Sequence, residues 1–175
     1  MAKPSGRPGS GPFLYAVALG SNRCGRQGLP EAMLRAAVAA LGGVRAASAI
    51  IATPPVGPSL RRYANMAVLI ETAETPPELL ARLKAIERAF GRRRGQRWGA
   101  RVLDLDIILW SGGAWGQPGL IVPHPAFRTR SFVLTPLRQI APRWRDPLSG
   151  RTMRQLASSL ALGPQATMWR ARMGP

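Results

Sequence analysis

Apolar residues gather along the chain in short runs separated by glycine, proline and asparagine. Four of these runs have the length and composition of strands, namely Phe13–Leu19, Val44–Ala52, Ala64–Thr72 and Leu103–Trp110. Between them, two longer stretches have helical composition and spacing. The pattern therefore predicts four strands interrupted by two helices.

The two predicted helices carry their own start and stop signals. Pro30–Leu41 is rich in alanine and leucine, begins with a proline suited to a first turn and is followed by Gly42. Thr75–Phe90 opens with threonine and proline and stops at Gly91. The order of elements is βαββαβ, so we expect an α+β fold with a ferredoxin-like core, in which two helices cover one face of a four-stranded antiparallel sheet.

Two further segments follow this core. Phe132–Ile140 and Met153–Ala161 have the spacing of shorter helices, which we interpret as C-terminal helical additions. Residues 1–12 are rich in glycine, proline and serine and predict a flexible leader, and residues 163–175 predict a flexible tail. We expect a single domain over residues 13–162, and no apolar run approaches the roughly 20 residues of a membrane-spanning helix.

The charge of the chain indicates a polyanionic partner without identifying it. Its 25 basic and 8 acidic residues give a formal net charge of +17, which attracts nucleic acid or a nucleoside triphosphate. Lys3 and Lys84 are the only lysines, so a GC-rich coding bias toward arginine is an equally good explanation of the excess. The single cysteine, Cys24, cannot form an internal disulfide, which fits a reducing cytoplasm.

Two of the three aspartates in the chain, Asp104 and Asp106, alternate with apolar residues in the fourth predicted strand. Strand side chains alternate between faces, so both carboxylates share one face about 6.6 Å apart along the strand. Such a pair of hard oxygen ligands suits magnesium and the phosphates that magnesium carries. The alternative is a solvated strand face.

An arginine-rich segment, Gly91–Arg101, precedes these aspartates. It contains five arginines and three glycines, which predicts a mobile loop that closes guanidinium groups around a polyphosphate. A solvated basic loop or a nucleic-acid patch would have the same composition. The neighbouring aspartates favour the triphosphate.

Two weaker patterns complete the candidate site. His124 lies between two prolines that fix its direction, so contact with a nucleotide phosphate competes with a structural role. Tyr63 and Asn65 share a strand face next to the proline-rich loop Thr53–Pro58, and an aromatic ring with an amide suits a flat heterocycle. A core tyrosine with a turn-forming asparagine would look the same.

Together these motifs resemble those of the 6-hydroxymethyl-7,8-dihydropterin pyrophosphokinase family, in the family's order and spacing across roughly Phe13–Leu160. The motifs are Leu19-Gly20-Ser21-Asn22, Thr53-Pro54-Pro55-Val56-Gly57, Tyr63-Ala64-Asn65, Arg97-Trp98-Gly99-Ala100-Arg101-Val102-Leu103-Asp104-Leu105-Asp106-Ile107 and Val122-Pro123-His124-Pro125. In two departures, Ala100 stands where the family usually has proline, and the arginine loop is one residue shorter than in a familiar bacterial member.

The resemblance implies an enzyme of folate biosynthesis that transfers pyrophosphate from ATP to the pterin hydroxymethyl group and releases AMP. It implies two Mg²⁺ ions held by Asp104 and Asp106, a cytoplasmic monomer, and a pterin stacked between Tyr63 and Phe132, with Glu87 close to the active centre. The implied roles are catalysis for Arg92, Arg101, Asp104 and Asp106; ATP binding for Arg94, Ile107, His124 and Arg130; and pterin binding for Thr53, Pro54, Val56, Tyr63, Asn65, Trp98 and Phe132.

The alternative is a nucleic-acid-binding module, because RNA-recognition domains also combine a ferredoxin-like sheet with positive charge. Such domains present aromatic side chains on their central strands, whereas Asp104 and Asp106 would repel phosphate unless a metal intervened. The sequence therefore favours the enzyme over the module, and no nucleic-acid or membrane partner is expected.

Overall fold

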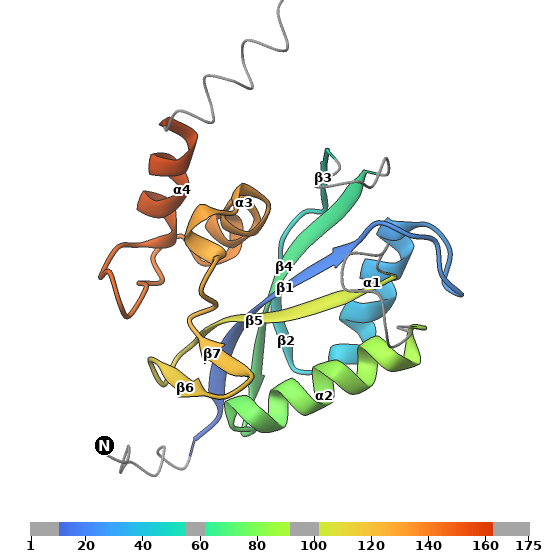
Figure 1. Cartoon of the computed structure of the whole chain (residues 1–175), viewed down its shortest axis with the longest axis horizontal. Coiled ribbons are helices and arrows are strands. Elements are labelled where there is room, and N and C mark those ends of the chain that lie inside the picture. Colours follow the sequence, from blue (N-terminus) through green and yellow to red (C-terminus); the bar gives the residue numbers. More distant parts are fainter. Residues whose placement is uncertain (1–10, 55–61, 92–101, 163–175) are drawn as a thin grey trace, which may run out of the picture.

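A computed structural model describes residues 11–54, 62–91 and 102–162 of the chain. Its central antiparallel sheet has the order β2 (Val44–Ala47), β4 (Tyr63–Thr72), β1 (Phe13–Ser21) and β5 (Asp104–Trp110), with the short β3 (Ile51–Thr53) also paired to β4 (Figure 1). This order, with β1 between β4 and β5, confirms the predicted ferredoxin-like core.

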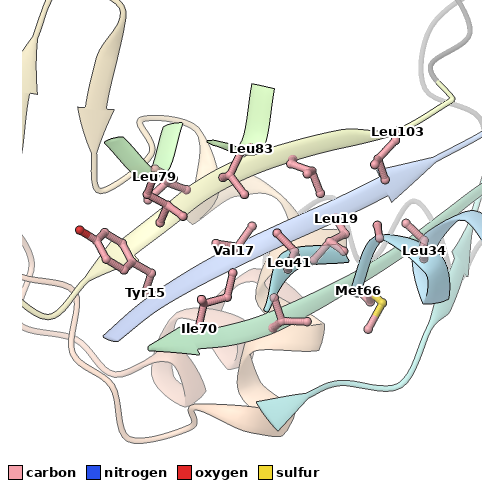
Figure 2. Close-up of a cluster of buried hydrophobic side chains, with 14 of the residues drawn as sticks. Tyr15, Val17, Leu19, Leu34, Leu41, Met66, Ile70, Leu79, Leu83 and Leu103 are labelled. Atoms are coloured by element: carbon pink, nitrogen blue, oxygen red, sulfur yellow. The ribbon is translucent and has the colours of Figure 1, made fainter. Parts of the chain in front are cut away.

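Helices α1 (Pro30–Leu41) and α2 (Pro76–Ala89) cover one face of the sheet (Figure 1). Helix α2 is preceded by its N-cap residue Thr75, whose backbone N–H donates to the Glu78 carboxylate at 2.8 Å, as in a capping box. Apolar side chains from both helices and from the sheet form the larger core (Figure 2). Its members include Tyr15, Val17, Leu19, Leu34, Leu41, Met66, Ile70, Leu79, Leu83 and Leu103.

Helices α3 (Ser131–Ile140) and α4 (Met153–Leu162) pack on the opposite side of the sheet. They share a second core with Ala16 of β1 and Ala67 of β4. The small side chains of the sheet let α3 approach it closely at this end. This second layer confirms the predicted C-terminal helices.

A register shift in β5 places two consecutive residues in the second core. Val17 of β1 pairs with Ile107 and the adjacent Ala16 pairs with Leu109, so Ile108 is an extra residue in the ladder. Ile108 and Leu109 both belong to the second core, and Trp110 returns to the first. The strict alternation that the sequence suggests for this strand therefore holds only as far as Ile107.

The predicted strand Val44–Ala52 is interrupted in the structure. The backbone N–H of Ser48 donates to the Ala67 carbonyl at 2.9 Å, and the Ser48 hydroxyl accepts from the Ala67 N–H at 3.0 Å. The next backbone N–H, that of Ala49, donates to the Gln139 side chain of α3 at 2.9 Å. Two side-chain bonds thus interrupt the regular backbone pairing here, and the segment divides into β2 and β3.

The structure also contains a small hairpin that we did not predict. Strands β6 (Trp115–Gln117) and β7 (Leu120–Val122) pair with each other, and the 3₁₀ helix η1 (Phe127–Thr129) follows them. None of the helices in the described part of the chain is long and apolar enough to cross a membrane. The predicted leader and tail fall largely in residues 1–10 and 163–175, outside the described residues.

Candidate active site

The two aspartates of β5 project from the face of the sheet that α1 and α2 leave uncovered. Leu105 and Ile107 lie in the larger core, so Asp104 and Asp106, which alternate with them, point to the opposite side and are half-buried. This confirms the predicted alternation of side chains between the two faces of the strand over Asp104–Ile107.

Gly20 of β1 links the aspartates to the other half of the site. It pairs with Asp104 on β5 and with Asn65 on β4, and directly paired residues in an antiparallel sheet project to the same face. Two inter-strand steps separate the carboxylate from the amide, which is about 10 Å between their Cα atoms. Ala18 likewise lies between Asp106 and Ala67. The floor between the two halves therefore consists of glycine and alanine.

The amide side of this floor is already ordered by its own hydrogen bonds. Asn65 is 6% exposed, and its Nδ2 donates to the Thr53 hydroxyl at 2.9 Å. Thr53 pairs through the backbone with Tyr63, which is half-buried on the same strand face as Asn65. Pro54, exposed, directly follows β3. The structure thus brings together the described residues for which the resemblance implies contact with the pterin edge.

Phe132 lies in the first turn of α3, the helix that packs against β4 on this side of the sheet. Its ring is partly buried against the second core, and the Arg130 guanidinium carbon lies 5.7 Å from the ring centroid. Stacking of a pterin between Tyr63 and Phe132 remains a prediction.

His124 is attached directly to β5, since its backbone N–H donates to the Ile108 carbonyl at 3.0 Å. Its ring Nδ1 accepts from the Ala126 N–H at 3.2 Å, so the neutral ring carries its proton on Nε2. Burial lowers the pKa of His124 below its ordinary value; the Asp106 carboxylate opposes this shift and Arg130 reinforces it. His124 is therefore close enough to interact electrostatically with both Asp106 and Arg130.

The carboxylates of the site repel each other. Burial raises the pKa of Asp106, and the negative charge of Asp104 raises it further, while Lys84 and His124 oppose the shift. A divalent cation would relieve this repulsion. Among the described residues, no group of three or more histidine, cysteine, aspartate or glutamate side chains is placed to hold a metal. A carboxylate pair alone fits Mg²⁺, which is typically bound by one or two carboxylates together with water and substrate phosphates.

For six of the predicted site residues the structure shows no side chain in the site. The Ile107 side chain is 4% exposed within the larger core, so a contact with ATP would involve its backbone. The other five lie outside the described residues: Val56, Arg92, Arg94, Trp98 and Arg101.

Two ion pairs near the site were not predicted from the residues. On α2, the Lys84 ammonium lies 2.8 Å from the fully buried Glu87 carboxylate, and both side chains bond to the backbone of Leu105. Glu87 was expected near the centre only by resemblance. The sequence does contain a signal for a special role of Glu87. It continues the apolar helical series Leu79 and Leu83 at a spacing of four residues, where a carboxylate is unusual.

The second ion pair supports the segment that carries His124 and Arg130. Arg128 donates from Nε and Nη2 to the buried carboxylate of Asp146 at 2.7 and 2.6 Å. Burial raises the pKa of Asp146, but the hydrogen bonds from Arg128 and Ser149 outweigh it and hold the pKa at about 2. The pair fastens η1 to the turn before α4.

Sequence comparison places the chain among named pyrophosphokinases. Residues 16–142 match the family described as 7,8-dihydro-6-hydroxymethylpterin-pyrophosphokinase (HPPK). A 2-amino-4-hydroxy-6-hydroxymethyldihydropteridine pyrophosphokinase of Methylorubrum extorquens is 41% identical over 82% of this chain and 91% of its own length. The protein of the same name from Bacillus subtilis is 44% identical over 71% of this chain and 75% of its own. The one from Synechocystis is 48% identical over 57% of this chain, a match that spans 51% of that relative.

Structural comparison agrees on the fold. A crystal structure of HPPK-DHPS in complex with substrates superposes with a TM-score of 0.69 at 12% identity, over 87% of this chain and 44% of the other. Wild-type Plasmodium falciparum HPPK-DHPS gives a TM-score of 0.69 at 13% identity, over 86% of this chain and 41% of the other. The chain thus spans less than half of these longer proteins. By the extent of the sequence matches, it belongs to the 7,8-dihydro-6-hydroxymethylpterin-pyrophosphokinase family.

Proposed function

We propose that this chain transfers a pyrophosphoryl group from ATP to the hydroxymethyl group of 6-hydroxymethyl-7,8-dihydropterin and releases AMP, a step of folate biosynthesis. The observation that carries the proposal is the pairing of Gly20 with both Asn65 and Asp104 in a member of this family. This pairing puts the Asn65 amide and the Asp104 carboxylate on one face, which supports binding of the heterocycle by the first and of the metal–nucleotide by the second, side by side.

The amide half of the site orients the acceptor. Asn65 and Thr53, held together at 2.9 Å, offer a donor and an acceptor to the edge of the pterin. Pro54 and the Val56 backbone border the same edge, and Tyr63, Phe132 and Trp98 supply apolar surface to its faces. Because Asn65 and Thr53 are already hydrogen-bonded to each other, binding energy is available to place the hydroxymethyl oxygen over the floor formed by Ala18 and Gly20.

The carboxylate half of the site receives the nucleotide. Asp104 and Asp106 would hold two Mg²⁺ ions. These ions would neutralise the negative charge of the triphosphate and the charge that develops during transfer. Arg94, His124, Arg130 and the Ile107 backbone would contact ATP. The electrostatic interactions of His124 with Asp106 and with Arg130 support this assignment.

The transfer itself requires positioning more than side-chain chemistry. The hydroxymethyl oxygen attacks the β-phosphorus of ATP in line, the bond from the β-phosphorus to the α-phosphate oxygen breaks, and AMP leaves. Arg92 and Arg101 stabilise the negative charge on the moving group. No covalent enzyme intermediate is needed.

The face that carries the site argues against an RNA-binding module. On this face β1 presents Ala18 and Gly20 and β5 presents Asp104 and Asp106, so Tyr63 of β4 has no aromatic neighbour at the facing positions of β1 or β5. RNA-recognition sheets stack bases on aromatic side chains at such positions, and two carboxylates repel phosphate. We further propose that the protein acts as a monomer in the cytoplasm, where the exposed thiol of Cys24 stays reduced.

Product analysis tests the proposed function. Purified protein is mixed with ATP, Mg²⁺ and 6-hydroxymethyl-7,8-dihydropterin, and AMP and the pterin pyrophosphate are measured by chromatography. We expect both products in equal amounts, and none when the pterin or Mg²⁺ is omitted. Formation of ADP, or AMP release that does not depend on the pterin, would contradict the proposal.

A further inference from the structure

The edge of β5 beside the aspartates is closed by two side chains of α2. β5 is the outer strand of the central sheet, so one side of its backbone has no neighbouring strand of that sheet. At Leu105, the backbone N–H donates to Glu87 Oε1 at 2.8 Å, and the carbonyl accepts from Lys84 Nζ at 3.4 Å. Lys84 Nζ and Glu87 Oε1 are themselves 2.8 Å apart.

These two contacts act on the peptide groups next to the two aspartates. The Leu105 N–H belongs to the peptide that joins it to Asp104, and the Leu105 carbonyl belongs to the peptide that joins it to Asp106. Fixing both peptide planes limits ψ of Asp104 and φ of Asp106. Those two angles set the directions in which the carboxylates leave the strand.

We propose that Lys84 and Glu87 form a positioning clamp that holds the backbone of β5 so that Asp104 and Asp106 point at a common ligand. The clamp rests on the proposed function, because it presumes that the two carboxylates jointly bind a Mg²⁺–nucleotide complex. Lys84 and Glu87 act through Leu105 and are positioning residues.

The burial of Glu87 supports this role over a purely structural one. Its side chain is fully buried at a position of α2 in line with Leu79 and Leu83. An apolar side chain there would avoid the desolvation of a carboxylate, and buried ion pairs often stabilise a fold less than apolar residues of similar size. A carboxylate at this position is understandable if its acceptor oxygen is needed at Leu105.

The test compares variants that separate charge from backbone contact. Glu87→Gln removes the charge but keeps a carbonyl oxygen that can accept from Leu105, whereas Glu87→Met has similar length and no such acceptor. Lys84→Met removes a positive charge near Asp106, which by charge alone would strengthen Mg²⁺ binding. Weaker Mg²⁺ binding in Lys84→Met would therefore indicate that the β5 backbone has lost its position.

Two other changes in α2 serve as controls. Leu79→Ala leaves a cavity in the larger core and lowers stability. It removes no hydrogen bond to β5, because the leucine side chain has no polar atom. Glu78→Gln removes an exposed acidic charge from the first turn of the same helix. Both should keep the wild-type dependence on Mg²⁺.

Calorimetric titration with Mg²⁺ and a non-hydrolysable ATP analogue is the first measurement, and steady-state kinetics with varied Mg²⁺ is the second. We expect Glu87→Met to weaken Mg²⁺–nucleotide binding about 10- to 100-fold and to lower kcat, with the KM for the pterin little changed. Glu87→Gln should recover most of the loss, and Lys84→Met should weaken binding severalfold. NMR exchange of the Leu105 amide should accelerate in Glu87→Met and not in Glu78→Gln.

Wild-type affinity and kcat in Glu87→Met, or equal losses in Leu79→Ala, would overturn the clamp. If Glu87→Met does not fold, the calorimetric titration of Lys84→Met tests the clamp instead. Unchanged or stronger Mg²⁺–nucleotide binding in that variant rejects the proposal. Calorimetry requires no turnover, so the clamp is tested even if the wild-type protein forms no AMP, an outcome that would contradict only the proposed function.

Discussion

Asn65 and Asp104 flank the same glycine, each paired to it through the backbone of its own strand. The amide lies on β4 and the carboxylate on β5, and β1 between them contributes no side chain at Gly20. The two substrates that we propose would meet over this gap.

Removing either carboxylate of β5 should abolish nearly all pyrophosphoryl transfer. Asp104→Ala and Asp106→Ala should each raise the barrier by about 2 kcal/mol or more, because both oxygens are needed to hold the same metals. The double variant should lose far less than the sum of the two effects. Turnover at saturating Mg²⁺ measures this, and circular dichroism should show an intact fold; full activity in either single variant would refute the metal assignment.

Adding a methyl group to Gly20 should impair binding of the pterin more than that of ATP. A Cβ at this position would lie 3.3 Å from Asn65 Oδ1, so the amide must shift to admit it. We expect Gly20→Ala to raise the KM for the pterin severalfold, about 1 kcal/mol, with a smaller effect on ATP affinity. Gly116→Ala is the matched control, because a Cβ there would meet no atom within 4 Å. A normal pterin KM in Gly20→Ala would show that the floor tolerates a side chain.

Replacing Phe132 with alanine should weaken pterin binding and leave ATP binding nearly intact. The ring lies at the start of α3 on the amide side of the sheet, where one face of a heterocycle could stack on it. Calorimetry with each ligand separately tests the assignment. Equal losses for both ligands with an unchanged fold would place Phe132 outside the pterin site.

The Arg128–Asp146 pair should make stability fall in acid. The pKa of Asp146 in the folded protein is about 2, below its ordinary value of 3.8, so the folded state favours the ionised carboxyl. The contribution is fully present above about pH 4 and is lost as the pH falls toward 2, on the order of 2 kcal/mol in total. Urea unfolding at pH 7 and pH 3 should show Asp146→Asn less stable than wild type at pH 7, with a smaller difference at pH 3. A difference that stays constant with pH would contradict the ion-pair explanation.

The parts of the fold that the sequence predicts well are those fixed by local pattern. The ends of Pro30–Leu41 are marked by proline and glycine, and the alternation around Asp104 and Asp106 is visible in five consecutive residues. The interruption at Ser48 depends on Ala67 and Gln139, which lie far away in the chain. The strands of the β6–β7 hairpin are three residues each, too short to establish a period.

The same distinction applies to the site. Residue type and spacing predict the shared strand faces of Asp104 with Asp106 and of Tyr63 with Asn65, because each motif is contiguous; the pterin role of the second pair comes only from the family resemblance. The contact of Glu87 with the Leu105 backbone joins a helix to a strand edge, and no local pattern specifies which helix residue reaches that edge. Asp146 is similar, since its partner Arg128 lies in a separate element.

The central position of β1 has a consequence for how proteins with this sheet can diverge. The span from the amide half to the carboxylate half equals two inter-strand steps, and hydrogen bonding sets those steps whatever side chains the strands carry. Replacements in β3 or α3 leave this pairing unchanged, so the separation of Asn65 and Asp104 is kept while their surroundings vary. A change in the pairing of β1 itself, such as an added bulge, would alter that distance, so the pairing of β1 fixes the separation of the two halves of the candidate site.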